Sequence, residues 1–315
     1  MPAMDKDISL EVSSALDGAR LDGAVRDALG NPSWSRVRGW ITSGKLRIDG
    51  RVELDPGFRL RLGQRVELLM NAPKPAVAGR LTSQSIAFVD PHLVVVRKPA
   101  GVNSIPFERG ERGTLQEMVR AWLNRSATKR NDPGRGDLGV VHRIDKETSG
   151  LLVFTRTLKA KRSLDEQLRD HTVERRYLAV AHGRVTAGRI ETRLVADRGD
   201  GIRGSTRDPK LGRTAITHVA PEQVLQGATL VSCRLETGRT HQIRIHLAER
   251  GHPLVGEMVY IRGLPGPFLP APRLMLHAAV LGFEHPVHGS RLRFEDPMPE
   301  DMRKVVASLQ RGKAR

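Results

Sequence analysis

One stretch of the chain, residues 140–154, constrains the fold more than any other. It reads VVHRIDKETSGLLVF, so an apolar segment, a polar middle containing one aspartate, a glycine and a second apolar segment follow one another. This pattern predicts two short buried strands joined by a tight connection. Asp145 lies in the connection, where an aspartate often caps a turn by accepting backbone N–H groups. The pattern alone therefore leaves two interpretations of Asp145: a turn cap, or a carboxylate held rigidly for chemistry.

The N-terminal residues 11–70 are predicted to form a small separate domain. Apolar residues at helical spacing predict a helix that begins at Leu21, and Ser33 is a suitable N-cap for a second helix. The Asp49-Gly50 pair then predicts the turn of a β-hairpin, because both residue types tolerate a positive φ. Two helices followed by a hairpin indicate a compact αβ unit.

A linker and a larger domain follow. Residues 71–82 contain two prolines and little hydrophobic periodicity, which is typical of a linker partly stiffened by proline. Residues 83–311 alternate predicted strands and helices, and within them residues 126–137 form a polar loop whose charges either contact a partner or are incidental. The strands are predicted at residues 86–89, 93–98, 174–183 and 229–235, and the helices at residues 114–123, 158–169, 241–250 and 299–310.

The charge of the chain predicts a polyanionic partner. The 315 residues include 52 lysines and arginines against 35 aspartates and glutamates, which gives a formal net charge of +17. Such an excess is typical of proteins that bind nucleic acid, although a basic surface can also be merely solvated. Aromatic residues make up 4% of the chain, which argues against a surface built mainly from stacking rings.

The remaining composition indicates a soluble, cytoplasmic protein. Cys233 is the single cysteine, so no intramolecular disulfide is expected. Residues 1–10 contain Asp5, Lys6 and Asp7 and lack the apolar core of a signal peptide. No apolar run approaches the roughly twenty residues that a membrane-spanning helix requires.

Three histidines, His241, His246 and His252, could suggest a metal site. The first two are five residues apart, whereas two ligands on one helical face would be four apart. No nearby cysteine or His-Glu pair completes a ligand set. No metal is therefore expected.

Several motifs resemble those of the RluA family of RNA pseudouridine synthases. The string HRIDKETSGLLV at residues 142–153 resembles the family's catalytic motif, and TGRTHQIR at residues 237–244 resembles its last catalytic-domain motif. Residues 98–102, KPAGV, and 174–183, ERRYLAVAHG, resemble two further segments. Residues 20–63 resemble an S4 RNA-binding domain. The resemblance implies an α+β protein: an N-terminal S4-like αβ RNA-binding domain, and a pseudouridine-synthase catalytic domain with a mixed, mostly antiparallel sheet.

The same resemblance implies a set of site residues. Asp145 would be the catalytic carboxylate, and Arg244 its ion-pair partner. Tyr177 would stack on the extruded uracil, with a part in removing the C5 proton left open, and Arg143 would fill the space that the base vacates. Glu257 stands where the family pattern leads us to expect aspartate, and it is expected to be structural.

The implied reaction is the isomerisation of uridine to pseudouridine, which breaks the N1–C1′ bond and joins C5 to C1′. It requires an ionised carboxylate and no cofactor. Whether Asp145 attacks the base, attacks the sugar or abstracts a sugar proton stays open. The expected substrate is large-subunit (23S) ribosomal RNA, with tRNA as a second candidate. The enzyme is expected to act as a monomer and without a membrane partner.

Two other functions are weighed against this one. A non-catalytic S4-type RNA-binding or ribosome assembly protein would have no need of Asp145, Tyr177 and Arg244 together. A carboxylate-dependent glycosidase or nuclease would need a second catalytic carboxylate or a metal cluster, and the motifs supply neither. An isomerase agrees with the motifs better than either alternative.

Overall fold

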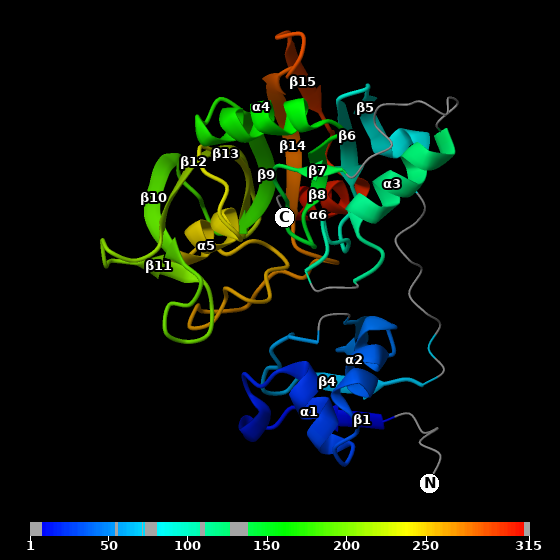
Figure 1. Cartoon of the computed structure of the whole chain (residues 1–315). Helices are drawn as coiled ribbons and strands as arrows, with labels where there is room; N and C mark the ends of the chain where they lie inside the picture. Colours follow the sequence, from blue (N-terminus) through cyan, green and yellow to red (C-terminus); the bar gives the residue numbers. More distant parts are fainter. Residues whose placement is uncertain are drawn as a thin grey trace. The chain divides into compact units, whose positions relative to one another are not determined.

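The computed structural model describes residues 8–53, 56–70, 72, 81–107, 111–126 and 138–311 of the chain. The chain divides into two compact units, residues 1–79 and 80–315, both drawn in Figure 1. The predicted linker spans their boundary. Most of that linker lies outside the described residues, as do residues 127–137 of the predicted polar loop.

The N-terminal unit packs two helices against an antiparallel sheet. Its described strands lie in the order β1-β4-β2-β3. The elements are β1 (Ile8–Glu11), α1 (Leu21–Ala28), α2 (Trp34–Thr42), β2 (Leu46–Ile48), β3 (Arg51–Val52) and β4 (Arg65–Leu68). Leu21 of α1, Ile41 of α2 and Val66 of β4 belong to one buried cluster, so this unit has a core of its own.

The cap and turn predictions for this unit are confirmed. The Ser33 side chain accepts a 3.4 Å hydrogen bond from the Arg36 N–H group at the start of α2. Asp49 and Gly50 have positive φ angles of 51° and 76° at the turn between β2 and β3. Two residues with positive φ match the right-handed twist of a two-residue hairpin.

The second unit is built on a mixed, mostly antiparallel sheet. Its described strands follow the order β11-β10-β12-β13-β9-β14-β8-β6-β5, with β15 paired to β14 and β7 to β8. The strands are β5 (Ile86–Val89), β6 (Leu93–Lys98), β7 (Gly139–Val140), β8 (Ser149–Thr155), β9 (Glu174–His182), β10 (Gly188–Val195), β11 (Gly204–Thr206), β12 (Arg213–Leu225), β13 (Ala228–Leu235), β14 (Leu276–Glu284) and β15 (Arg291–Glu295). Among the described pairs only β8 and β14 run parallel, as the predicted fold class requires.

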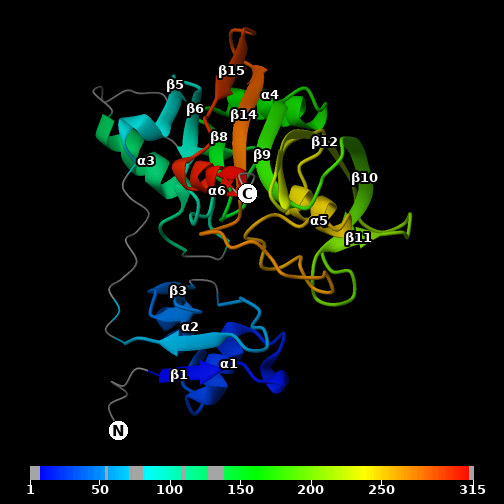
Figure 2. The same cartoon turned by 180° about the vertical axis from the view of Figure 1, so that it is seen from behind.

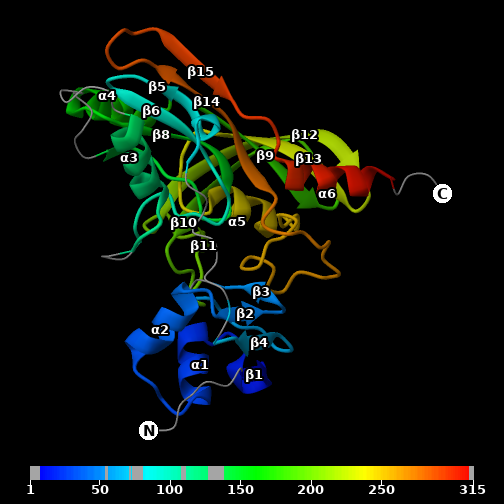
Figure 3. The ribbon, with the colours of Figure 1, turned by 90° about the vertical axis from the view of Figure 1, so that its right-hand side faces the viewer.

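The described α-helices of this unit are α3 (Leu115–Ser126), α4 (Leu158–Arg169), α5 (Gln242–Glu249) and α6 (Glu300–Arg311). Leu164 of α4 packs with residues of β6, β8 and β14, whereas Met302 of α6 packs with Val180 of β9. Figures 2 and 3 show these two helices on opposite sides of β14. Helix α5 packs through Ile245 against β10 and β12. None of the described helices has the length and apolarity needed to span a bilayer.

The apolar–polar–apolar stretch forms β7, a connection and β8. Strand β8 is buried along its whole length, between β6 and β14. The prediction of a buried first strand is wrong, because β7 has two residues and both Val140 and Val141 are only half-buried. Asp145 therefore follows a half-buried strand and precedes a fully buried one.

Gly150 allows β8 and β14 to approach closely. It has a φ of 113° and pairs with Ala278 in the parallel ladder. A Cβ atom on residue 150 would lie 2.3 Å from the carbonyl oxygen of Ala278, which is far inside van der Waals contact. Only glycine fits this position without moving a strand.

We expect Gly150→Ala to lower the free energy of unfolding by about 3–5 kcal/mol, because the added methyl group meets backbone atoms and the φ angle is unfavourable as well. Gly251→Ala is the matched control. Gly251 has a φ of 78° but no atom within 4 Å of an added Cβ, so its loss should be about 1–2 kcal/mol. Urea unfolding measures both variants, and equal losses would contradict the steric argument.

Candidate active site

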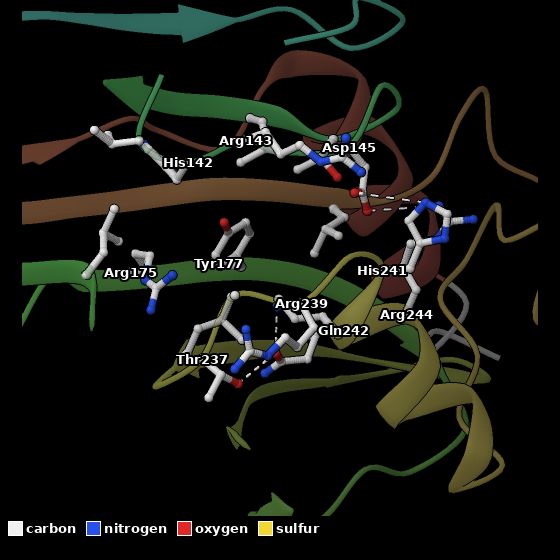
Figure 4. A pocket seen from close by; sticks show the side chains of 18 of the residues that line it. His142, Arg143, Asp145, Arg175, Tyr177, Thr237, Arg239, His241, Gln242 and Arg244 are labelled. Carbon is white, nitrogen blue, oxygen red and sulfur yellow. Dashed lines mark hydrogen bonds and ion pairs between the residues drawn. The ribbon is translucent and has the colours of Figure 1, made fainter. Parts of the chain in front are cut away.

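A cleft of about 660 Å³ lies in the second unit, between the connection that follows β7, strand β9 and the junction from β13 into α5. Figure 4 shows most of the side chains that line it. The cleft brings together the four predicted site residues: Arg143, Asp145, Tyr177 and Arg244. Three separate segments of the chain supply these residues, so the tertiary fold assembles the site.

Asp145 presents its carboxylate to the cleft. The side chain is 18% exposed, and its oxygen atoms lie 3.9 Å from Arg244 Nη1 and 3.9 Å from His241 Nε2. In the described part of the chain no backbone N–H group donates to this carboxylate. The turn is closed instead by the Thr148 N–H group, which donates to the main-chain carbonyl of Asp145. The geometry therefore gives no support to the turn-cap interpretation.

Two buried side chains anchor the segment around Asp145. Lys98 Nζ donates to three main-chain carbonyl oxygens, one of which is that of Lys146 at 2.8 Å. Ser104 Oγ donates to the carbonyl oxygen of Ile144 at 2.7 Å. Because the residues on both sides of Asp145 are held through their backbones, its carboxylate is positioned and still available to a substrate.

Arg244 is bound more closely to Glu257 than to Asp145. Its Nε and Nη2 donate to the two Glu257 oxygens at 2.8 and 2.7 Å, whereas Asp145 lies 3.9 Å from Nη1. Burial alone would raise the pKa of Glu257, but Arg244 and backbone N–H groups lower it, so this carboxylate is ionised. The predicted pairing with Asp145 is thus the longer of two contacts. Glu257, which sequence analysis connected with no site residue, fixes the guanidinium that faces Asp145.

The predicted helix at residues 241–250 begins one residue later than expected. His241 precedes α5 in the left-handed conformation, with φ 58° and ψ 18°, and the helix starts at Gln242. Nδ1 of His241 and the Tyr260 hydroxyl form a 2.6 Å hydrogen bond. Burial, followed by the nearby Arg244, lowers the pKa of His241 to about 4. The imidazole is therefore neutral at physiological pH and adds no charge to the cleft.

Tyr177 and Arg143 differ in how firmly they are held. Tyr177, on β9, is 8% exposed, and burial raises its pKa to about 12. The phenol therefore stays protonated at neutral pH and is a poor base for removing the C5 proton. Arg143 is exposed, and its Nη2 donates to the Thr240 hydroxyl at 3.3 Å. The cleft thus contains a fixed aromatic ring and, at its edge, an exposed guanidinium.

The fold adds residues to the cleft that sequence analysis did not identify. Arg175 lies two residues before Tyr177 on β9, so the alternation of the strand puts both side chains on one face. That alternation is the sequence signal that could have found it. Gln242 Oε1 accepts from the Thr237 hydroxyl at 2.8 Å and from the Arg239 N–H group at 3.0 Å, which fixes the turn before α5.

The histidines considered as metal ligands have separate partners. His246 is held between the hydroxyl groups of Thr192 and Thr217, at 3.0 and 2.9 Å. His252 Nδ1 donates to the carbonyl oxygen of His182 at 2.9 Å. Within the described ranges, no group of three or more His, Cys, Asp or Glu side chains is placed to hold a metal ion.

The fold of the second unit is shared with solved pseudouridine synthases. Human RNA pseudouridylate synthase domain containing 4 has a TM-score of 0.59 and 20% identity, over 72% of this chain and 93% of that one. Human RNA pseudouridylate synthase domain containing 1 has a TM-score of 0.53 and 22% identity, over 73% and 95%. The chain therefore has the pseudouridine synthase fold.

Sequence similarity then gives the family. The RNA pseudouridylate synthase family matches residues 92–249, and the S4 domain matches residues 19–66. Ribosomal large subunit pseudouridine synthase D of Xanthomonas campestris is 35% identical over 96% of this chain and 93% of that protein, and that of Zymomonas mobilis is 36% identical over 93% and 94%. An uncharacterised RNA pseudouridine synthase of Bacillus subtilis is 33% identical over 97% and 99%. The chain belongs to the RNA pseudouridylate synthase family and is an isomerase with an S4 domain, as its motifs predicted.

Glu257→Gln should weaken both folding and catalysis, because it leaves the buried Arg244 guanidinium without a charged partner to orient it. The free energy of unfolding is expected to fall by about 3–5 kcal/mol. The single-turnover rate on saturating RNA should fall as well. Glu257→Asp keeps the charge and should restore most of both losses. Urea unfolding and a single-turnover assay provide the measurements, and a Gln variant as stable and as active as the unmutated protein would refute the orienting role.

Proposed function

We propose that this enzyme converts specific uridines of large-subunit ribosomal RNA to pseudouridine, with Asp145 as the reacting carboxylate. The observation that carries the proposal is the setting of that carboxylate. It lines the cleft, is 18% exposed, and has an oxygen 3.9 Å from Arg244, whose guanidinium is fixed by Glu257. An ionised carboxylate held beside one oriented cation is what the reaction needs.

The chemistry breaks the N1–C1′ bond, turns the uracil and joins C5 to C1′. Asp145 starts this sequence by attacking the base, attacking the sugar or removing a sugar proton, and each route uses the carboxylate as an anion. Arg244 supplies the positive charge beside it. His241 is neutral, so it can contact the substrate or Asp145 without adding a second cation.

The uracil must leave its stack before it can reach Asp145, because C1′ and C5 are shielded inside a helix. Tyr177 offers the extruded base a fixed aromatic ring on which to stack. Arg143 would fill the space that the base vacates. It is exposed, and its described hydrogen bond to Thr240 is long and costs little to break.

Two observations favour large-subunit ribosomal RNA as the substrate. Relatives that are 35% and 36% identical bear that substrate in their names, and a net charge of +17 suits a large polyanion. We assign RNA binding to residues 11–70 and the chemistry to residues 83–311, in a cytoplasmic enzyme that acts as a monomer. A tRNA substrate would leave the proposed chemistry unchanged.

The alternative function, a non-catalytic S4-type RNA-binding or ribosome assembly protein, is disfavoured by the same cleft. A protein that only binds RNA gains nothing from an oriented guanidinium beside a partly exposed carboxylate. Its basic N-terminal unit would suffice. There Arg36 projects from α2 with an exposed side chain, which is typical of contacts that bind phosphate without reading sequence.

Asp145→Asn is expected to abolish isomerisation while the protein stays folded, because the amide keeps the size of the side chain and removes its charge. Pseudouridine should be undetectable in a single-turnover assay on large-subunit rRNA fragments. RNA affinity should stay within about a few-fold, since phosphate contacts are unaffected.

The unmutated enzyme, assayed on the same fragments and mapped chemically for pseudouridine, is the control for this variant. A folded Asp145→Asn protein that isomerises uridine at a comparable rate would remove Asp145 from the reaction. If the unmutated enzyme modified tRNA only, the rRNA assignment would fall and the assignment of Asp145 would stand.

Removing residues 1–75 should weaken RNA binding more than it slows the chemical step on saturating RNA. The N-terminal unit has its own core and contributes none of the proposed reacting groups. Because counterion release drives phosphate contacts, the difference in affinity between the full chain and the truncated protein should shrink as salt rises. Binding curves at several salt concentrations test this prediction. An unchanged affinity of the truncated protein at low salt would contradict the assignment of RNA binding to residues 11–70.

A further inference from the structure

Arg175 is a buried cation in the cleft without a carboxylate partner. Its side chain lines the cleft, and the residue is 7% exposed. Nη2 donates to the main-chain carbonyl oxygen of Glu236 at 2.7 Å, whereas the buried Nε has no hydrogen-bond partner. Among the described residues no Asp or Glu side chain lies within ion-pair distance of this guanidinium. Arg244, the other buried arginine of the cleft, has Glu257 as its partner.

An unpaired buried charge weakens folding, so its presence calls for a compensating role. Burial lowers the pKa of Arg175, and the nearby positive charge of Arg239 lowers it further. The backbone also makes room for this side chain. A Cβ atom on Gly238 would lie 2.7 Å from Arg175 Nη1, so a larger residue at position 238 would displace the guanidinium from this place.

Arg175 lies next to the place that the target uracil would occupy. Arg175 and Tyr177 lie on one face of β9, about 7 Å apart along the strand. Figure 4 shows Asp145, Tyr177 and Arg175 following one another along the cleft. If C1′ of the target nucleotide is at Asp145 and its uracil lies on Tyr177, the edge of the ring remote from the sugar points toward Arg175. That edge carries the O4 carbonyl.

We propose that Arg175 donates a hydrogen bond to O4 of the target uracil and stabilises the negative charge that this base gains during the reaction. The inference rests on the proposed function of Asp145. When the N1–C1′ bond breaks, its electron pair stays with uracil and is shared among N1, O2 and O4. The base then forms the C5–C1′ bond, loses the C5 proton and takes up a proton at N1, so no oxidant or reductant is needed.

This contact also selects uracil over cytosine. Cytosine carries an amino group at C4, which would turn N–H donors toward the N–H donors of Arg175. A buried donor left unpaired costs about 1–3 kcal/mol, and more when it is charged. Arg175 would therefore act both in specificity and in stabilising the leaving base. A charged donor aimed where charge develops is an effective form of catalysis in a site that excludes water.

A phosphate is the other RNA group that an arginine could bind. The phosphates of the target nucleotide are attached to its sugar, which the proposal places at Asp145, whereas Arg175 lies beyond Tyr177. The two interpretations predict different kinetics. A phosphate contact strengthens binding at low salt, and a contact with O4 acts mainly on the chemical step.

The test compares Arg175→Gln and Arg175→Lys with the unmutated full chain on one rRNA fragment that this enzyme modifies. Arg176→Gln is the matched control, since Arg176 is the next residue of β9, on the opposite face and outside the cleft. We expect Arg175→Gln to reduce the single-turnover rate at saturating RNA by about 100-fold. Its RNA affinity and salt dependence should change little, and its thermal stability should be no lower, because an unpaired buried charge is removed. Arg175→Lys should recover part of the rate.

A second arm places 4-thiouridine at the target position, because sulfur accepts hydrogen bonds weakly. The unmutated enzyme should slow on this RNA, while Arg175→Gln should show little further loss. Full speed of the unmutated enzyme on 4-thiouridine would overturn the proposal even if the Gln variant failed to fold. An Arg175→Gln defect confined to affinity and to the salt slope would also overturn it, in favour of a phosphate contact.

Two controls separate this inference from the proposed function. An unmutated enzyme that forms no pseudouridine on either rRNA or tRNA contradicts the proposed function and, with it, the inference. An unmutated enzyme and an Arg175→Gln variant that are equally active contradict the inference alone.

Discussion

A buried ammonium group ties the catalytic segment to the central sheet. Lys98, at the end of β6, is 2% exposed, and its Nζ donates to three main-chain carbonyl oxygens, including that of Lys146. Burial lowers the pKa of Lys98 to about 7, and the carboxylates of Glu147 and Asp145 oppose that shift. Three acceptors match the three donors of an ammonium group, so the contacts favour the charged form. The connection that carries Asp145 cannot move away without removing one of these acceptors, the Lys146 carbonyl oxygen, and leaving a buried donor unpaired.

The two buried arginines of the cleft have different electrostatic roles. Arg244 is neutralised within the protein, since Glu257 holds it through two hydrogen bonds and leaves Nη1 facing Asp145. Arg175 has no such partner among the described residues, and its charge is balanced only when a substrate with electron-rich oxygens enters. Arg244 is thus a fixed cation that faces the Asp145 carboxylate. Arg175 stabilises the negative charge that develops on the uracil during the reaction.

Local signals predicted much of the fold. The bounds of α4 agree with the predicted helix at residues 158–169, and the Ser33 cap and the Asp49-Gly50 hairpin turn are also where the sequence placed them. Strands β10 to β12 were not predicted. Strand β10 has two buried apolar residues, Ile190 and Leu194, and the polar Thr192 stands between them, so the apolar alternation that would indicate a strand is incomplete.

Sequence motifs likewise account for only part of the candidate site. Motifs predicted Asp145, Tyr177 and Arg244, because each lies in a recognisable string. They did not reveal that Glu257 orients Arg244 or that Arg175 lacks a counter-ion, because such relations depend on how separate segments meet in the fold. The sequence alone does not show whether a carboxylate lies close enough to an arginine to form an ion pair.

The glutamate at position 257 shows what the site requires of that residue. The family pattern leads one to expect aspartate, whose side chain is one methylene shorter. Glu257 nevertheless reaches both donors of Arg244, and its Oε1 also accepts the N–H groups of Met258 and Val259 at 3.0 and 2.8 Å. The physical demand is therefore a buried, ionised carboxylate with its oxygen atoms fully hydrogen-bonded. A small adjustment of the loop after residue 256 can meet that demand with either acid, whereas a neutral side chain would leave Arg244 without the charge that keeps it turned toward Asp145.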